Sequence, residues 1–541
     1  MRRRRFFEAK RLQRLFWAGI RPSFVCSESN ITATMGGFTQ GEEFLSQLGR
    51  RTFLSFWSWP NLFRDQGDCV RGGDGKEICD LSVIFDENII LFSDKGIRFQ
   101  KERELGVAWP RWARKAIKDS HKQLMGSERW IQQYPDRIFL DPQCSTKIPI
   151  PLPKPDRIAI HKVIIAHGIE EILLEQGLEP SFRFDLGLTD EISWMAGNET
   201  PFTLGKLSGE SFVHIFTQAA IELALREFDT TKDFIWYLAQ RKRLLTSSLK
   251  IKISSESDIL QLYYEGIEDY QAGRIIDLDQ LSASPSSVVS KGGISNLHWN
   301  PSYQAKKYSD GISYFWDDLV EGFNHHVLNQ TSERKINWTT ADQIEPILRN
   351  LAKPSRFERR VLSEIFTDFY HKTPPRCRAT RVFTNPEHPE TSYLFLLLPH
   401  LSFFESESNY RDIRVEMLAS YCSIAKLRLP HTKGIIAIGA KTRDEADTKI
   451  TPEFLEEGQD FMWHDVSEWN AEDEDQAKRL ETAFKQEGFI GERQWFEGRS
   501  FEFPDESGSL RNLRKKQIKG SSRNEPCWCG SGKKIKKCCG K

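Results

Sequence analysis

The stretch that decides the fold is Glu77-Ile78-Cys79-Asp80-Leu81-Ser82-Val83-Ile84-Phe85-Asp86-Glu87-Asn88-Ile89-Ile90-Leu91-Phe92-Ser93-Asp94-Lys95. Two runs rich in β-branched and aromatic residues, 77–85 and 89–95, flank the polar residues 86–88, which are typical of a turn. This pattern predicts a β-hairpin. Polar side chains stand at the ends of its strands, and they include Asp80, Asp94 and Lys95.

Helical and strand patterns continue on both sides of the hairpin. Before it, apolar residues recur at helical spacing over 41–54. After it, the sequence predicts a helix over 112–131 and apolar strands at 137–140 and 158–166. The predicted order is therefore helix, two adjacent strands, helix and strand, which is an α/β arrangement.

This order is similar to that of the restriction-endonuclease-like, or PD-(D/E)xK, core over residues 38–170. The resemblance implies a nuclease site in which strand carboxylates hold Mg²⁺ or Mn²⁺ beside a lysine that orients water and phosphate. It places Asp80 at the first strand position and Lys95 at the lysine position. Glu42 resembles the opening-helix glutamate of the NERD and Mrr-like branches, and Gln123 resembles their helical glutamine.

One position departs from that pattern. Two residues before Lys95, where the family has Asp or Glu, the chain has Ser93, and the nearest carboxylate is Asp94. Neighbouring side chains on a regular strand point to opposite faces, so Asp94 and Lys95 line one site only at a bulge or a strand end. An active nuclease, an inactive member of the fold, and an unrelated α/β domain with solvated hairpin ends all remain open.

Four of the ten cysteines crowd the last fifteen positions, while six are scattered singly. The crowded residues form a Cys-x-Cys pair and, after eight residues, a Cys-Cys pair, with Gly530 and Gly532 allowing the backbone to reverse between them. Four thiolates suit the tetrahedral coordination of a structural Zn²⁺. The alternatives are an exposed disulfide pair or an unstructured basic tail. The candidate zinc ligands are Cys527, Cys529, Cys538 and Cys539.

Residues 523–541 resemble the SEC-C motif, the zinc module found at the end of the SecA translocation motor. The usual form is Arg-Asn-Glu-Pro-Cys-Pro-Cys-Gly-Ser-Gly-Lys-Lys, and the chain departs from it at Trp528, which replaces a proline. Cys539 stands where histidine is often the fourth ligand, which preserves the ligand chemistry. The chain has no Walker sequence, so the resemblance does not imply a translocase.

The tail is strongly basic, although the whole chain has 76 Lys and Arg against 76 Asp and Glu. Residues 511–541 contain eleven Lys or Arg and one acidic residue, Glu525. This charge suits docking to nucleic acid, to a ribosome or to an acidic protein surface, and such docking weakens with salt. A solvated tail that aids solubility is the alternative.

The rest of the chain predicts further α/β structure. Phe212–Thr217 has a strand pattern, and helical patterns follow over 218–228 and 231–247, the second with Asp229 as a candidate cap. His325 and His326 are adjacent, and neighbours on a helix point in different directions, so they are interpreted as surface residues.

A second α/β pattern covers residues 376–440. Two strands are predicted within 376–400, followed by a helix from Tyr410 to Leu429 and a buried strand from Gly434 to Ala440, which implies a right-handed parallel crossover. Three polar residues after the last strand could line a ligand crevice, but ordinary loop solvation is favoured. These residues are Lys441, Arg443 and Asp444.

At 541 residues the chain exceeds the size of one hydrophobic core. We expect a basic segment at 1–37, a restriction-endonuclease-like domain at 38–170, α/β domains at 171–330 and 331–505, a basic linker at 506–522 and the zinc knuckle at 523–541. The apolar stretch 393–404 is too short to span a membrane and no export signal is visible, so the cytoplasm is the expected compartment.

Two functions follow from these features. The first is a cytosolic zinc protein of nucleic-acid metabolism or defence, with a metal-dependent nuclease domain and a SEC-C tail for recruitment. The second is a non-enzymatic adaptor whose SEC-C knuckle binds a protein or ribosomal partner. Fold alone does not separate them.

Overall fold

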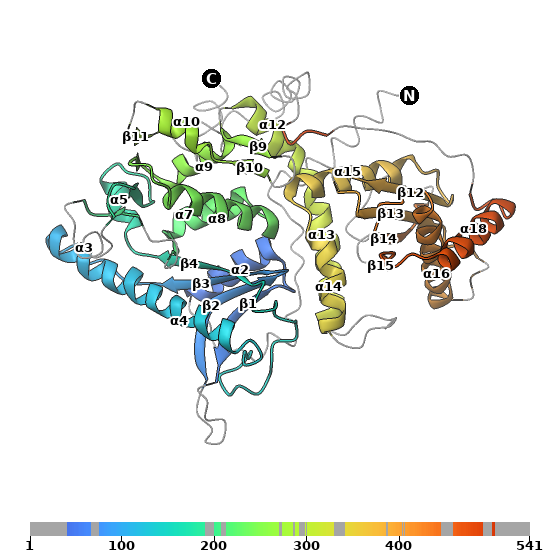
Figure 1. Cartoon of the computed structure of the whole chain (residues 1–541), viewed down its shortest axis with the longest axis horizontal. Helices are drawn as coiled ribbons and strands as arrows, with labels where there is room; N and C mark the ends of the chain where they lie inside the picture. The colour runs from blue at the N-terminus through green and yellow to red at the C-terminus, as the bar shows by residue number, and fades with distance from the viewer. Residues whose placement is uncertain are drawn as a thin grey trace.

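The hairpin predicted at 77–95 lies at the centre of a five-stranded sheet (Figure 1). The computed structural model describes residues 40–65, 75–189, 200–206, 212–269, 273–284, 287–290, 298, 300–328, 341–385, 388–402, 404, 406–444, 458–490 and 500–503. Within these ranges the chain forms helices and several separate sheets. The predicted multidomain α/β class is therefore confirmed.

The central sheet has the order β1-β2-β3-β4-β7. The hairpin strands β2 and β3 pair antiparallel, as do β1 and β2, whereas β3, β4 and β7 run parallel to one another. The carboxyl ends of these three parallel strands therefore meet at one edge of the sheet. The strands are β1 (Ser58–Arg64), β2 (Lys76–Phe85), β3 (Asn88–Lys95), β4 (Ala159–Ala166) and β7 (His214–Phe216).

Helices cover both faces of this sheet. On one face, Phe92 of β3 contacts the rings of Phe53 and Phe234, which belong to α2 (Gln40–Phe53) and α8 (Thr231–Leu245). On the other face, Lys162 of β4 pairs with Glu128 of α4 (Asp119–Gln133). The core between the layers is continuous and mostly aliphatic and aromatic.

The helix predicted over 112–131 is part of a longer helical segment. It comprises α3 (Leu105–Ala113), the π-helical turn η1 (Arg114–Lys118) and α4. The strand predicted at 137–140 is wrong, because Phe139 alone forms isolated bridges, to Phe63 and to Lys147. Phe139 exchanges both backbone hydrogen bonds with Phe63, and the chain then turns through positive φ at Cys144 instead of extending the pairing.

Beyond β4 the chain adds small sheets and helices above the same core. The predicted helix at 218–228 is confirmed as α7 (Gln218–Glu227). One small sheet has the order β11-β8-β5-β6, and β9 pairs with β10. These elements are α5 (Glu170–Glu175), β5 (Arg183–Asp185), β6 (Thr203–Leu204), β8 (Lys252–Ile253), α9 (Glu256–Tyr264), β9 (Ile267–Asp269), β10 (Gly273–Ile275), α10 (Leu278–Ala283) and β11 (Val288–Val289).

The proposed capping role of Asp229 is wrong. The N-cap of α8 is Thr230, whose side chain accepts a hydrogen bond from the backbone N of Asp233. Asp229 is buried instead, and its Oδ1 lies 2.7 Å from Nε of Arg356. Burial by itself would raise the pKa of Asp229, but the neighbouring guanidinium of Arg356 outweighs it and lowers the pKa to about 2.

A helical layer connects the two halves of the molecule. Arg356, at the start of its last helix, also lies 2.9 Å from Asp317, so one buried cation ties this layer to the α7–α8 turn. The layer consists of α12 (Pro301–Asp310), η2 (Gly311–Ser313), α13 (Tyr314–Leu328), α14 (Ala341–Ala352) and α15 (Arg356–Lys372).

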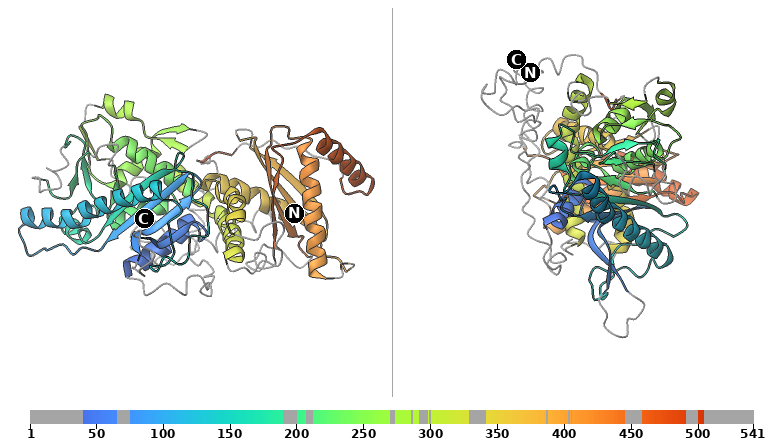
Figure 2. Two further views of the ribbon diagram at one scale, coloured as in Figure 1. Left: turned by 60° about the horizontal axis from the view of Figure 1, so that its bottom comes forward. Right: turned by 90° about the vertical axis from the view of Figure 1, so that its left-hand side faces the viewer.

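The second α/β unit contains a four-stranded sheet of order β12-β13-β14-β15. The predicted crossover is confirmed, because β13 and β14 pair in parallel and α16, which connects them, packs on one face of the sheet (Figure 2). The elements are β12 (Ala379–Thr384), β13 (Thr391–Leu398), α16 (Glu407–Lys426), β14 (Gly434–Lys441), β15 (Asp460–Asp465) and α18 (Ala471–Gln486).

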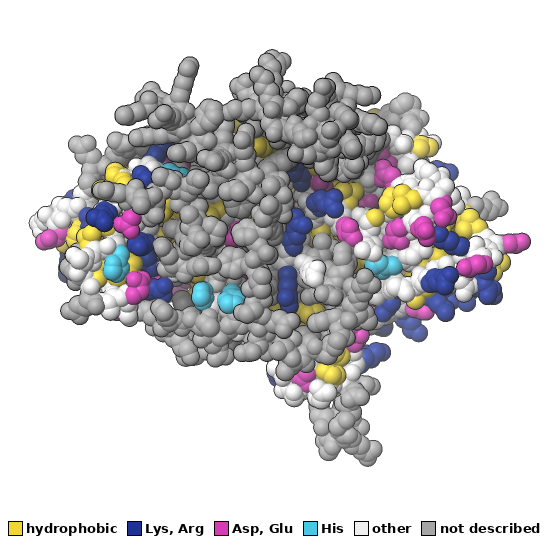
Figure 3. Space-filling model, turned by 180° about the vertical axis from the view of Figure 1, so that it is seen from behind, with side chains coloured by type: hydrophobic (Ala, Val, Ile, Leu, Met, Phe, Trp, Pro, Cys, Tyr) yellow, Lys and Arg dark blue, Asp and Glu magenta, His cyan; other side chains and the backbone are white. Residues whose placement is uncertain are grey.

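The strand β7 belongs to the central sheet, although its residues fall in the segment that the sequence assigns to the middle domain. The predicted domain boundaries stay predictions. Seen from behind, the described side chains show Lys and Arg interspersed with Asp and Glu (Figure 3). Among the described residues, no helix is long and apolar enough to cross a membrane.

Candidate functional site

The hairpin divides the predicted catalytic residues between the two faces of the sheet. Leu81 pairs with Phe92, so Asp80 lies opposite Ser93 and shares its face, and Lys95 follows two residues later on that same side. Asp94 points to the other face. Its backbone N donates a 2.6 Å hydrogen bond to Oδ2 of Asp80, which holds the buried Asp80 carboxylate at the end of the hairpin.

Asp94 takes part in a hydrogen-bonded chain at the carboxyl edge of the parallel strands. His167, directly after β4, donates from Nε2 to Oδ1 of Asp94. Its other ring nitrogen, Nδ1, lies 3.0 Å from Oε1 of Gln218, the first residue of α7. One residue from each of three neighbouring strand ends therefore contributes to the chain Asp94–His167–Gln218.

The neighbours of His167 favour its protonated form. Nε2 of Gln218 donates a 3.0 Å hydrogen bond to Glu222, which orients the amide so that its oxygen faces His167. Both ring nitrogens of His167 then face acceptors, and only the imidazolium can donate to both. Burial alone would lower the pKa of His167, but the bond and charge of Asp94 and the bond to Gln218 raise it above its usual value.

Glu170 links the same strand ends through the backbone. Its Oε2 accepts hydrogen bonds from the backbone N of Gly168 at 2.9 Å and of Ile169 at 3.0 Å. Its Oε1 accepts from the backbone N of Gln218 at 3.1 Å, at the start of α7. This carboxylate therefore accepts backbone hydrogen bonds both from the turn after β4 and from the start of α7.

The other predicted nuclease residues lie on α2 and α4. Glu42 is within α2, and its side chain lies outside the part of the chain that is described. Gln123 is half-buried on α4, which packs on the face that carries Asp80. Ser93, at the expected carboxylate position, is fully buried, and its Oγ has no hydrogen-bond partner among the described residues.

The described residues contain no group of three or more His, Cys, Asp or Glu side chains arranged to hold a metal ion. The catalytic assignment of Glu42, Asp80, Asp94, Lys95 and Gln123 therefore stays a prediction. Sequence reasoning missed His167 and Gln218. Each directly follows a predicted strand, and both strands run parallel in the sheet. The rule that sites gather at the carboxyl ends of parallel strands points to both residues.

The predicted crevice residues of the second α/β unit contact neighbouring loop residues. Arg443 donates to the backbone oxygens of Thr373 at 3.2 Å and His371 at 3.4 Å. Asp444 lies 3.4 Å from Arg376 and 3.9 Å from Lys441. These contacts agree with loop solvation. His326 is exposed and His325 half-buried on α13, in agreement with their interpretation as surface residues.

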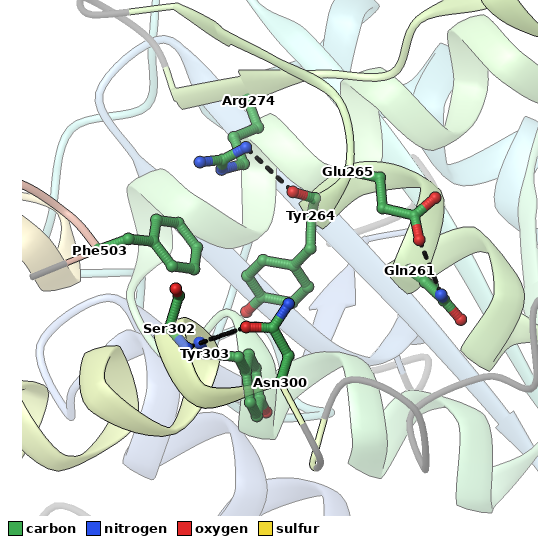
Figure 4. A pocket seen from close by; sticks show the side chains of 8 residues that line it. All are labelled: Gln261, Tyr264, Glu265, Arg274, Asn300, Ser302, Tyr303 and Phe503. Atoms are coloured by element: carbon green, nitrogen blue, oxygen red, sulfur yellow. Dashed lines mark hydrogen bonds between the residues drawn. The ribbon is translucent and has the colours of Figure 1, made fainter. Parts of the chain in front are cut away.

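A cavity of about 340 Å³ opens where α9, β10, α12 and Phe503 meet (Figure 4). The hydroxyl groups of Tyr264 and Tyr303 donate to buried Glu227, and the guanidinium of Arg274 lies 4.5 Å from the Phe503 ring centre. Arg274 also donates to two backbone oxygens. The two tyrosine hydroxyls and one nitrogen of Arg274 are thus hydrogen-bonded within the protein, whereas Oε1 of Gln261 and Nε of Arg274 are buried without a hydrogen-bond partner among the described residues. The cavity is lined by Gln261, Tyr264, Glu265, Arg274, Asn300, Ser302, Tyr303 and Phe503.

The predicted zinc ligands Cys527, Cys529, Cys538 and Cys539 lie outside the described residues. Four thiols in two close pairs nevertheless have the donor chemistry of a closed structural zinc site. Searches of curated proteins and of solved structures find no match to the chain. A family model of the SEC-C motif matches residues 523–541, which supports a zinc-binding module there. The chain thus carries a SEC-C motif at residues 523–541.

Proposed function

We propose that this protein is a zinc-dependent adaptor, in which the SEC-C segment recruits the α/β body to an anionic partner. The observation that carries the proposal is the SEC-C match on a segment with four closely spaced cysteines. Cys527, Cys529, Cys538 and Cys539 would hold one structural Zn²⁺. The ion would supply the folding free energy that so short a segment cannot obtain from an apolar core.

The charge of the tail suggests the kind of partner. Eleven Lys or Arg residues against one Glu over 511–541 leave the segment positive even when four thiolates bind one divalent ion. A polyanion such as nucleic acid or an acidic protein or ribosomal surface complements that charge. Binding should weaken as salt rises, because screening and counterion release both reduce the electrostatic term.

Elemental analysis of the purified chain tests the zinc assignment. We expect one zinc per chain, and loss of that zinc in the double variant Cys527→Ser/Cys529→Ser. The matched control is Cys144→Ser/Cys377→Ser, which changes two described cysteines outside the motif and should retain the metal. Zinc that survives the first substitution, or a chain that never contains it, would refute the adaptor's recruitment module.

A metal-dependent nuclease is the second candidate. The observation that favours it is that Asp80 and Lys95 share one face at the end of the hairpin. Asp94 on the opposite face, bonded to His167, argues against the full predicted set. Ser93 stands where the pattern has Asp or Glu, so Mg²⁺ or Mn²⁺ would find one carboxylate fewer there.

Incubation with DNA and RNA in Mg²⁺ or Mn²⁺ separates the two candidates. A nuclease that uses this face should cleave, lose activity in Asp80→Ala and in Lys95→Ala, and keep it in Asp94→Asn. Cleavage that persists without Asp80, or no cleavage in either metal, would leave the adaptor as the remaining proposal.

A further inference from the structure

The segment formed by α3, η1 and α4 exposes a line of cations on the surface of the first α/β unit. Its inner side is buried in the core, through residues such as Trp112, Ile117 and Leu124. Its outer side carries Lys and Arg side chains, all of which are exposed. We call these residues the basic stripe: Arg111, Arg114, Lys115, Lys118, Lys122 and Arg129.

The spacing of the stripe follows the helix. Counted from Arg111, the next cations on this face follow after four, seven and eleven residues, at Lys115, Lys118 and Lys122. This spacing places them on one face of the helix. At 1.5 Å per residue, the line from Arg111 to Lys122 is about 16 Å long and reaches Arg129 after about 27 Å. The π-helical turn lies inside this line, and π-helical turns often occur at functional sites.

These cations have no carboxylate partner among the described residues, whereas several other surface cations do. Lys101 pairs with Glu171 and Arg428 with Glu481. In the described part of the chain, no ion pair involves any residue of the basic stripe. Asp119 is the single exposed acid between Arg111 and Arg129, since Glu128 is paired with Lys162. The outer face therefore presents a nearly uniform positive charge.

Three properties define the partner. The apolar inner face of the segment is buried, and its exposed apolar residues, Leu105 and Val107, precede the stripe. The stripe itself therefore has no apolar side to insert into a lipid surface. The stripe exposes no aromatic ring between Arg111 and Arg129, whereas single-stranded nucleic acid and protein partners are usually bound with aromatic contacts. A straight, regularly spaced line of cations instead fits phosphates along a duplex.

We propose that the basic stripe binds the phosphate backbone of a nucleic-acid duplex. The stripe lies in the described α/β body and is separate from the SEC-C segment, so the inference does not depend on the adaptor function. Arg and Lys side chains would contact phosphate oxygens without reading base edges, which predicts affinity for duplexes of any sequence.

Fluorescence anisotropy of a labelled DNA duplex, titrated with the full chain at several salt concentrations, tests this surface. The test variant is Arg111→Gln/Lys115→Gln/Lys118→Gln/Lys122→Gln. The matched control removes one Arg and three Lys from exposed positions of the second α/β unit: Lys433→Gln/Lys478→Gln/Arg479→Gln/Lys485→Gln. Each lost phosphate contact reduces the slope of log K against log salt by about 0.9.

We expect the stripe variant to lose about 3 to 4 units of that slope and at least about tenfold in affinity, while the control stays within about twofold. Equal losses in both variants would show an effect of net charge alone, and an unchanged slope in the stripe variant would assign binding to another segment. Either outcome overturns the proposal. So does tighter binding to a single strand, or to phosphatidylserine vesicles, than to the duplex.

A second measurement needs no variant and is unaffected by folding defects. Acetylation of the unmodified chain, followed by mass spectrometry, reports the reactivity of individual lysines. Duplex should protect Lys115, Lys118 and Lys122 and leave Lys478 unprotected. Equal reactivity of the three stripe lysines with and without duplex would refute contact at this surface.

Discussion

At the scale of single residues, His167 is the most informative side chain of the central sheet. Its two ring nitrogens join the Asp94 carboxylate and the Gln218 amide, so it stabilises the fold as an imidazolium. A hydrogen bond to a charged group stabilises a protein by about 2 kcal/mol. The same contacts explain why Asp94 is unsuited to a metal site that would also use Asp80 and Lys95.

The pH dependence of this contact is a testable consequence. Because the folded-state pKa of His167 lies above its unfolded value, the contact stabilises fully below the unfolded pKa of about 6.5, and its contribution is lost as pH rises through the folded pKa. The destabilisation caused by Asp94→Asn should therefore be larger at pH 6 and below than above the folded pKa.

NMR titration and denaturant unfolding can check this expectation. The pKa of His167 should lie above 6.5 in the unmodified chain and fall in Asp94→Asn. His431→Gln, which changes an exposed histidine, is the control and should leave the pH profile unchanged. A difference in unfolding free energy that grows with pH would contradict an imidazolium at this position.

At the scale of elements, predictions from long local patterns were confirmed, whereas a short predicted strand that depended on tertiary pairing was wrong. The hairpin and the β13–α16–β14 crossover were predictable, because long apolar runs and clear turn residues precede any packing choice. The strand expected at 137–140 did not form, since Phe139 alone makes isolated bridges, to Phe63 of β1 and to Lys147. An isolated pair of backbone bonds does not extend without a register partner on either side.

The edge strand β1 contains a residue that suits its position in the sheet. Its residues include Pro60, which cannot donate a ladder hydrogen bond and suits an edge strand. Among the described strands, β1 pairs with β2 at the edge of the sheet, and on its other side Phe63 makes an isolated bridge to Phe139. The capping residue of α8 was also decided by packing, because Asp229 is required by Arg356 and its neighbour Thr230 caps the helix.

At the scale of the whole molecule, residues 500–503 return to the middle of the body. Arg360 donates to the backbone oxygens of Phe501 and Glu502, and Phe503 packs against Tyr264. The first residue of the SEC-C motif, Arg523, lies twenty positions after Phe503. At about 3.5 Å per residue, the motif can therefore lie at most about 70 Å from this anchor.

Two truncations test the anchor. A chain that ends at Phe503 keeps all described contacts of residues 500–503 and should unfold thermally at the same temperature as the full chain. A chain that ends at Ser500 leaves buried Arg360 without two acceptors and removes the Phe503 ring, which should cost on the order of 3 kcal/mol. Equal unfolding temperatures for the two truncations would exclude a stabilising role for the anchor.

The sequence by itself determined the α/β class, the hairpin, the parallel crossover and the SEC-C segment, because periodicity, turn chemistry and cysteine spacing are local properties of a chain. The tertiary structure decided which face each hairpin side chain occupies, which residues meet at the carboxyl edge, and which cations remain unpaired. His167 and Gln218 are 51 residues apart, and the basic stripe differs from an ordinary charged helix only in what its neighbours leave unneutralised. Such relations exist only after distant segments have packed, so no local pattern could specify them.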